Sequence, residues 1–134
     1  MNQPTESPKS VTPPLETTEA VSPSYNRIDL DEFKKLQLVT ARILAAERVP
    51  KSKRLVRMEV DLGSERRQIV AGIATRYEPE ALVGRNVVIV ANLKPATLMG
   101  VESNGMVLAA SVGEAGTPVL LDVPADVAPG TKVK

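Results

Sequence analysis

The chain has 134 residues, of which 43% are hydrophobic and 2% aromatic, and its formal net charge is +1. It contains no cysteine and no histidine, which excludes disulfide bonds, zinc sites built on these residues, and catalysis by a thiol or an imidazole. No apolar run approaches the roughly 20 residues that cross a membrane, and no secretory signal pattern is present, so we expect a soluble, cytoplasmic protein of one domain.

Residues 1–25 are rich in proline, serine, threonine and glutamate. Proline interrupts helices and strands, and too few apolar side chains are present to form a core. We therefore predict a disordered tail or linker over residues 1–25, and one folded domain over residues 26–134. Because the chain begins with Met1 and shows no catalytic sequence upstream, we expect a stand-alone protein, although a fragment of a larger protein would have the same features.

Residues 28–35 are predicted to form a short helix. Asp29 can cap its first turn, and Glu32 follows three residues later, as in a capping box. We expect the apolar side chains of Leu30, Phe33 and Leu36 to face inward.

The next segments have the alternating pattern of β-strands. We predict strands over residues 36–48, 55–62 and 67–73, separated by turns at residues 49–52 and 63–64. In the second strand Val56, Met58 and Val60 share one face, which we expect to be buried.

A second short helix is predicted over residues 78–83, with Pro79 in its first turn and Gly84 at its C-terminal end. The apolar run 86–91 predicts a buried strand, and residues 106–110 a fifth strand, with a loop over residues 92–105 between them. Short apolar runs between prolines in residues 112–134 indicate edge strands and loops.

Three strands, a short helix and two further strands are the order of a Greek-key barrel of the oligonucleotide-binding type. We therefore predict an all-β fold with short helices, built as a five-stranded OB-fold barrel plus C-terminal edge strands. An unrelated small β-barrel is the alternative.

Positive charge is concentrated in the middle of the chain. Between Arg42 and Arg76 nine basic residues face four acidic ones, a net charge of +5, whereas both ends of the chain are acidic. This distribution is typical of proteins that bind polyanions. The alternative is an ordinary solvated surface.

No arrangement of residues predicts catalysis. A Ser-His-Asp triad needs histidine, no P-loop string occurs, and Asp29 with Asp31 are better explained as helix-start residues than as a metal pair. We expect no enzymatic activity, no cofactor and no metal.

The binding candidates lie at the first two strands. Arg42, Arg54 and Arg57 fall on or beside strands that oligonucleotide-binding barrels use, and Lys53 adjoins them. Each could neutralise a phosphate, although a single arginine is more often a solubility residue. The low aromatic content argues against stacked single strands and favours a folded RNA recognised by backbone and shape.

The loop 92–106 combines apolar and polar side chains. Leu98 and Met99 could hold an extruded base, or could close the end of the barrel together with Met106. From the residues alone we favour barrel closure for Met106. For Ser103 and Asn104, in a turn flanked by glycine, a binding role and a structural role stay open.

Four strings within these elements resemble the tRNA-binding domain family. They are Arg-Gln-Ile-Val-Ala-Gly-Ile at 67–73, Tyr-Glu-Pro-Glu-Ala-Leu-Val-Gly-Arg at 77–85, Val-Ala-Asn-Leu-Lys-Pro at 90–95, and Gly-Val-Glu-Ser-Asn-Gly-Met-Val-Leu-Ala-Ala at 100–110. The resemblance extends from about residue 28 to the end. The family includes the C-terminal domain of bacterial methionyl-tRNA synthetase, free-standing structure-specific tRNA-binding proteins, and a branch related to secretion chaperones.

The resemblance implies an oligonucleotide-binding barrel that binds the outer corner of tRNA with little sequence specificity. It also implies a homodimer formed through the N-terminal helix and the C-terminal strands, and association with an aminoacyl-tRNA synthetase. The RNA contacts that it implies are Arg42, Arg54, Lys94, Ser103, Asn104 and Met106.

The sequence departs from the family pattern at Ala96 and Thr97, where basic residues are frequent. We expect Lys53 and Arg57 to compensate for these charges. The alternative function is a protein-interaction, dimerisation or chaperone-like peptide-binding module of the same fold.

Overall fold

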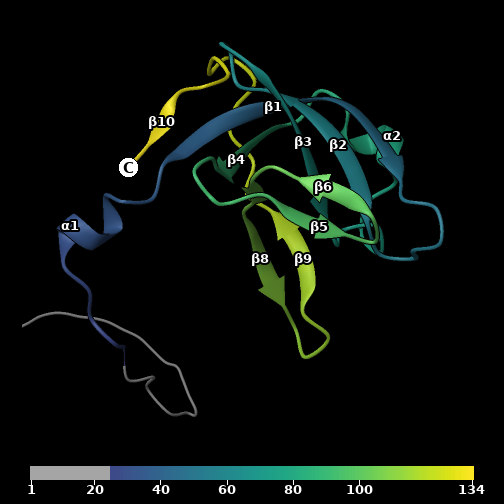
Figure 1. Ribbon diagram of the computed structural model, residues 1–134, viewed down its shortest axis with the longest axis horizontal. Coiled ribbons are helices and arrows are strands. Elements are labelled where there is room, and N and C mark those ends of the chain that lie inside the picture. Colours follow the sequence, from purple (N-terminus) through teal and green to yellow (C-terminus); the bar gives the residue numbers. More distant parts are fainter. Residues whose placement is uncertain (1–24) are drawn as a thin grey trace, which may run out of the picture.

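A computed structural model describes residues 25–134, so all of the predicted tail except Tyr25 lies outside the described residues. The described chain is mostly β, as predicted, and its main sheet curves into a barrel (Figure 1). The elements are α1 (Leu30–Phe33), β1 (Leu38–Arg48), β2 (Val56–Asp61), β3 (Arg66–Ala71), α2 (Pro79–Leu82), β4 (Asn86–Val90), β5 (Ala96–Leu98), β6 (Val101–Ser103), β7 (Met106–Val107), β8 (Ala109–Val112), β9 (Thr117–Leu120) and β10 (Lys132–Val133).

The barrel is a five-stranded antiparallel sheet in the order β3-β2-β1-β4-β7. β1 pairs with β2 through its second half and with β4 through its first half, and the register shifts between Ile43 and Ala45. Such an irregularity bends a strand and increases its twist, which lets one long strand serve both walls. The barrel closes where the backbone N–H of Asn104 donates to the carbonyl of Gln68 on β3 at 2.8 Å. The five-stranded barrel predicted from the sequence is thereby confirmed.

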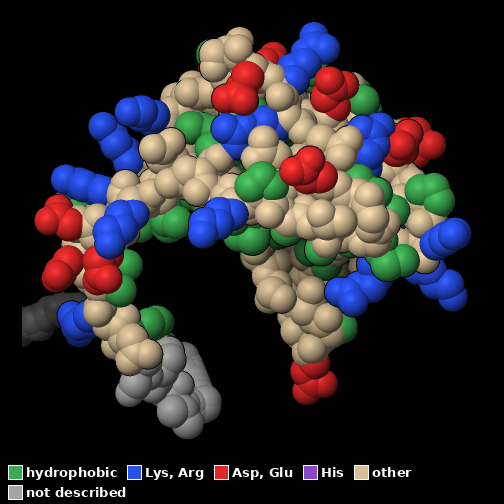
Figure 2. Space-filling view, viewed as in Figure 1, with side chains coloured by type: hydrophobic (Ala, Val, Ile, Leu, Met, Phe, Trp, Pro, Cys, Tyr) green, Lys and Arg blue, Asp and Glu red, His purple; other side chains and the backbone are tan. Residues whose placement is uncertain are grey.

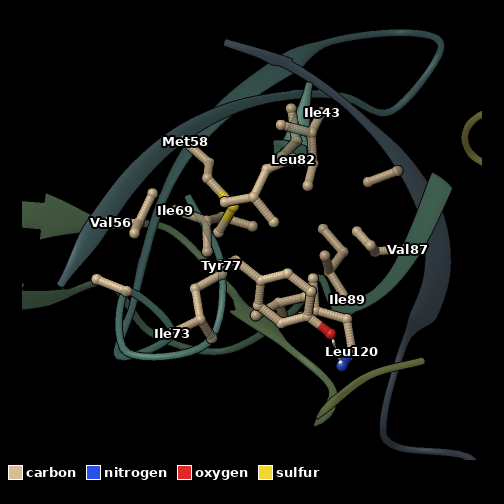
Figure 3. Packing of buried hydrophobic residues seen from close by; sticks show 14 of the residues in the cluster. Ile43, Val56, Met58, Ile69, Ile73, Tyr77, Leu82, Val87, Ile89 and Leu120 are labelled. Carbon is tan, nitrogen blue, oxygen red and sulfur yellow. Dashed lines mark hydrogen bonds between the residues drawn. The ribbon is translucent and has the colours of Figure 1, made fainter. Parts of the chain in front are cut away.

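Aliphatic side chains fill the barrel. The predicted inward face of the second strand is confirmed, because Val56, Met58 and Val60 are all buried. Figure 3 shows Met58 of this strand in one cluster with Leu82 of α2 and with Tyr77. The Tyr77 hydroxyl accepts a hydrogen bond of 3.0 Å from the backbone N–H of Leu120, so the ring joins the core to β9.

The predicted second helix is confirmed as α2. Pro79 occupies its first position, where the missing N–H costs no hydrogen bond, and Gly84 follows with φ of +92°. Leu82 is fully buried, so this short helix closes one end of the barrel.

The prediction of a loop over residues 92–105 is wrong in part, because β5 and β6 form a hairpin there. Met99 and Gly100 connect the two strands, and both have positive φ. The turn lacks the Asn-Gly or Asp-Gly pair that marks most two-residue hairpins, so local patterns did not predict a hairpin here.

The predicted fifth strand divides into two. β7 pairs with β4 inside the barrel, whereas β8 leaves it and pairs with β9. The β8–β9 hairpin projects away from the barrel (Figure 1). The predicted edge strands of residues 112–134 are present as β9 and β10.

The helix α1 begins as predicted, because the backbone N–H of Asp29 donates to the Glu32 carboxylate at 3.4 Å, part of a capping box. The prediction that its apolar side chains face inward is wrong: Leu30, Phe33 and Leu36 are exposed. The physical reason is visible in Figure 1, where α1 lies apart from the barrel and no element of the described chain covers it.

The C-terminal segment, residues 122–131, crosses one end of the barrel before β10 pairs with the start of β1. The Thr40 hydroxyl donates to the carbonyl of Ala128 at 2.8 Å and accepts from the N–H of Thr131 at 3.0 Å. One buried threonine therefore holds the segment against β1.

Tyr77→Phe tests the link between the core and β9. The substitution leaves the buried N–H of Leu120 without a partner, so we expect the free energy of unfolding to fall by about 1–3 kcal/mol. Urea denaturation measures the change. Tyr25→Phe, at an exposed ring, is the control and should leave stability unchanged; equal midpoints for the two variants would contradict the assigned role.

Candidate nucleic-acid interface

The β1–β2 loop, residues 49–55, carries exposed positive charge and is held by local hydrogen bonds. The N–H of Ser52 donates to the carbonyl of Val49 at 3.1 Å, and the Ser52 hydroxyl accepts from the N–H groups of Arg54 and Leu55. The loop exposes Lys51, Lys53 and Arg54. Oligonucleotide-binding barrels use this loop as one of their contact surfaces.

The basic middle of the sequence is partly neutralised in the fold. Arg57, Arg66 and Arg67 form ion pairs with Glu47, Glu59 and Glu65, respectively. By contrast, Lys51, Lys53 and Arg54 form no ion pair with any described residue. The positive charge that the sequence spreads over 35 residues is therefore concentrated at the β1–β2 loop, where Figure 2 shows basic side chains at the right-hand edge.

The predicted contact Arg57 is part of an internal network. Its guanidinium donates to Glu47 at 2.9 Å and to the side-chain oxygen of Gln68 at 3.1 Å. The hydrogen bond and the charge of Arg57 lower the pKa of the Glu47 carboxyl. Gln68 in turn donates to the carbonyl of Glu102 at 2.8 Å, so Arg57 links β1, β2 and β3 to β6.

The predicted contact Arg42 points toward the C-terminal segment. Its guanidinium donates to the carbonyls of Ala125 at 2.7 Å and Val127 at 3.4 Å. Asn86, its partner across β1 and β4, donates to the carbonyls of Pro124 and Val127. Arg42 therefore fastens the C-terminal segment to the barrel.

The β4–β7 connection, residues 91–105, holds three of the predicted contacts, and the first two have different surroundings. Lys94 is exposed and forms no ion pair within the described chain. Ser103 is only 4% exposed, and its hydroxyl accepts from the N–H of Val70 at 2.9 Å and donates to the carbonyl of Gly105 at 3.0 Å. The buried hydroxyl of Ser103 thus joins β3 to the β6–β7 turn.

Asn104 and Met106 lie at the edge of the barrel. The Asn104 side chain is half-buried, and no described residue hydrogen-bonds to its amide. The expectation that Met106 closes the barrel is wrong, because Met106 is 48% exposed. The strand pairing explains this: β7 turns Val107 into the core, and Met106, its neighbour, faces outward.

Sequence reasoning missed a groove beside Arg54. Gly72 and Thr75 line one wall, the β8–β9 turn at residues 115–118 lines the other, and the volume is about 380 Å³. The walls are some 40 residues apart in sequence, and no local pattern indicated that they meet.

Other kinds of site are not seen in the part of the chain that the structure describes. No group of three or more acidic side chains there could hold a metal ion. Neither of the described helices is long enough to span a membrane.

A five-stranded antiparallel barrel with a short helix between β3 and β4 has the architecture of the oligonucleotide-binding barrels. Residues 38–132 match the family model of the tRNA binding domain. The chain belongs to the tRNA-binding domain family.

Individual relatives agree with this assignment. The chain is 55% identical over 115 residues to a methionine–tRNA ligase of Thermotoga maritima, covering 86% of this chain and 18% of the ligase. A structure of a MetRS-related protein from Pyrococcus horikoshii is 40% identical, with a TM-score of 0.78 over 82% of this chain and 100% of that one. The chaperone CsaA of Bacillus anthracis is 34% identical, with a TM-score of 0.72 over 81% of this chain and 99% of that one.

The chain thus spans less than a fifth of the ligase that it matches. In contrast, it covers nearly all of the two smaller relatives.

Arg42→Ala tests the internal role of Arg42. Removing the guanidinium leaves the carbonyl of Ala125 without this donor and takes one of two donors from the carbonyl of Val127, so we expect stability to fall by about 1–3 kcal/mol in urea denaturation. Lys53→Ala is the control, because an exposed side chain without a partner should change stability by less than about 0.5 kcal/mol. A loss no larger for Arg42→Ala than for Lys53→Ala would refute the role.

Proposed function

We propose that the chain is a non-catalytic, cytoplasmic tRNA-binding module that recognises folded tRNA by shape and backbone charge. The observation that carries this proposal is the group of unpaired cations on the β1–β2 loop. Exposed lysine and arginine without acidic partners can neutralise phosphates and release counterions. The family match supports tRNA as the nucleic acid.

The aromatic residues favour recognition by shape over base stacking. The whole chain holds Tyr25, Phe33 and Tyr77. Tyr77 is buried in the core, Phe33 belongs to α1, and Tyr25 precedes α1. None of them provides a platform on the barrel, and stacking platforms are what sequence-tolerant single-strand binders use.

The proposed contacts follow from exposure. Lys53, Arg54 and Lys94 bind backbone phosphates, and the free amide of Asn104 together with the exposed Met106 approaches a base or a ribose. Three other predicted contacts hydrogen-bond within the protein and therefore position the interface without binding RNA themselves: Arg42, Arg57 and Ser103.

The ligase relatives suggest the biological setting. A module of this kind increases the affinity of a synthetase for its tRNA, either as an appendage of that enzyme or as a stand-alone protein that binds the same tRNA. We propose an aminoacyl-tRNA synthetase as the associated enzyme.

A second candidate function is peptide binding. A groove of about 440 Å³ lies between the end of α1 and β10, and its lining includes Phe33, Leu36 and Val133. These apolar side chains and the similarity to the chaperone CsaA favour an interaction with another polypeptide. Salt separates the two functions, because binding to an apolar peptide does not weaken in proportion to log salt.

We also propose that the same apolar surface pairs two copies of the chain. Phe33→Glu with Leu36→Glu should convert the homodimer into a monomer, since burial of charge at an apolar interface is unfavourable. Light scattering after size exclusion measures the mass. Val83→Glu, at an exposed apolar residue of the barrel, is the control. A wild-type protein of monomeric mass at micromolar concentration would refute the homodimer.

The central test compares two variants with the same loss of charge. Lys53→Ala, Arg54→Ala and Lys94→Ala together should lower the affinity for total tRNA about tenfold or more, and reduce the slope of log affinity against log salt by about 2–3. The control replaces Lys34, Lys35 and Lys132, which lie at α1 and β10. Filter binding between 50 and 200 mM salt measures both quantities. Equal losses in the two variants would show that net charge alone matters and would contradict the proposed interface.

A further inference from the structure

Two residues of the described chain other than glycine have a positive φ. Lys51 has φ of +71°, and Met99 has φ of +51°. This left-handed conformation is uncommon for side chains other than those of Asn and Asp, because Cβ crowds the backbone.

Each of the two residues occupies a turn position that favours glycine or asparagine. Lys51 is the third residue of the turn 49–52, which the Ser52 N–H closes on the Val49 carbonyl, and Pro50 precedes it. A proline followed by a residue with positive φ is the pattern of a type II turn, in which glycine is preferred at the third position.

Met99 is the second residue of the turn 98–101, which joins β5 to β6. Leu98 pairs with Val101, so Met99 and Gly100 form a two-residue loop in which both φ angles are positive. This is the pattern of a type I′ turn, which favours Asn-Gly. Methionine at this position is less stable than asparagine, and its side chain is 59% exposed, so packing does not compensate for the strain.

The two strained residues lie in two specific loops. Lys51 is in the β1–β2 loop and Met99 is in the β4–β7 connection, and these are the two loops that oligonucleotide-binding barrels use to contact nucleic acid. Both turns lie toward the right-hand side of the barrel in Figure 1. Strained, exposed side chains tend to occur at binding sites, where they are held by the surrounding structure.

The surrounding structure does hold both turns. The Ser52 hydroxyl fixes the backbone after Lys51, and the hairpin that carries Met99 is fastened to β3 through Gln68 and Ser103. The backbone of both turns is therefore ordered before binding, so a ligand has to order only the two side chains.

We propose that Lys51 and Met99 both contact RNA. Glycine or asparagine would be more stable at these turn positions, but would lack the ammonium group of Lys51 and the apolar side chain of Met99. Lys51 binds a backbone phosphate, and the apolar, polarisable side chain of Met99 packs against an unstacked base. This inference rests on the proposed tRNA-binding function and adds contacts to it. The unpaired cations next to Lys51 identify the occupant as a polyanion and not as an apolar peptide.

The test uses substitutions that relieve strain and remove the contact together. Met99→Asn and Lys51→Asn should each raise Tm by a few degrees, because asparagine tolerates positive φ. Each should also weaken binding to total tRNA by about three- to tenfold, and Lys51→Asn should reduce the salt slope by about one. A residue with only a structural role would not give higher stability together with weaker binding.

Two controls separate side-chain chemistry from turn geometry and from net charge. Met99→Leu keeps an apolar side chain in the same turn and should retain the wild-type affinity. Lys35→Asn removes one charge at the C-terminal side of α1 and should leave the affinity nearly unchanged.

The outcomes distinguish this inference from the proposed function. If the wild-type protein binds tRNA and both asparagine variants bind equally well, the pair is not a contact and the inference fails alone. If the wild-type protein does not bind tRNA at low salt, the proposed function fails and the inference fails with it.

Discussion

The strand β1 is the element on which the rest of the structure depends. It pairs with β2, β4 and β10, so it contributes to both walls of the barrel and also anchors the C-terminal strand. Its register shift near Ile43 lets an 11-residue strand bend far enough to do this. Ala41 and Ile43 face the core, whereas Thr40 and Arg42 hydrogen-bond to the C-terminal segment. The alternation of side chains along this one strand therefore positions both the core and the C-terminal segment.

The arrangement of charge divides the surface into a supporting part and a binding part. On the strands, the arginines lie beside glutamates and form ion pairs or networks, which neutralises the side of the barrel. On the β1–β2 loop the cations form no ion pair with an acidic residue of the described chain, so they stay available. A modest net charge of +1 is therefore compatible with a local site of strong positive potential.

The sequence predicted those parts of the fold that depend on local patterns. The alternation of Val56, Met58 and Val60 predicted a buried strand face, and Pro79 with Gly84 predicted the limits of α2. The β5–β6 hairpin was not predicted, because methionine is not a residue type that is typical of such turns. The predicted burial of the apolar residues of α1 was also wrong. Amphipathic spacing shows that one face of a helix is apolar, but it does not show which surface, if any, covers that face.

The candidate site was harder to predict than the fold. Basic residues near the first two strands could be recognised from their position, but their partners could not. Whether Arg42 is free or bound depends on carbonyls more than 80 residues away, and the burial of Ser103 depends on Val70. Contacts of this kind are set by tertiary structure. They decide which of the candidate side chains are exposed.

The pairing of β10 with β1 has a consequence for the order of events during synthesis. Val133 pairs with Leu38 across almost the whole length of the domain, so the edge at the start of β1 is covered only after residues 132–133 have been synthesised. Until then the start of β1 has a free edge, and free edges recruit other chains. Lys34 and Lys35 precede this edge and Lys132 lies in the strand that completes it. Lysine beside an exposed strand edge is a common means by which proteins disfavour edge-to-edge pairing with other chains.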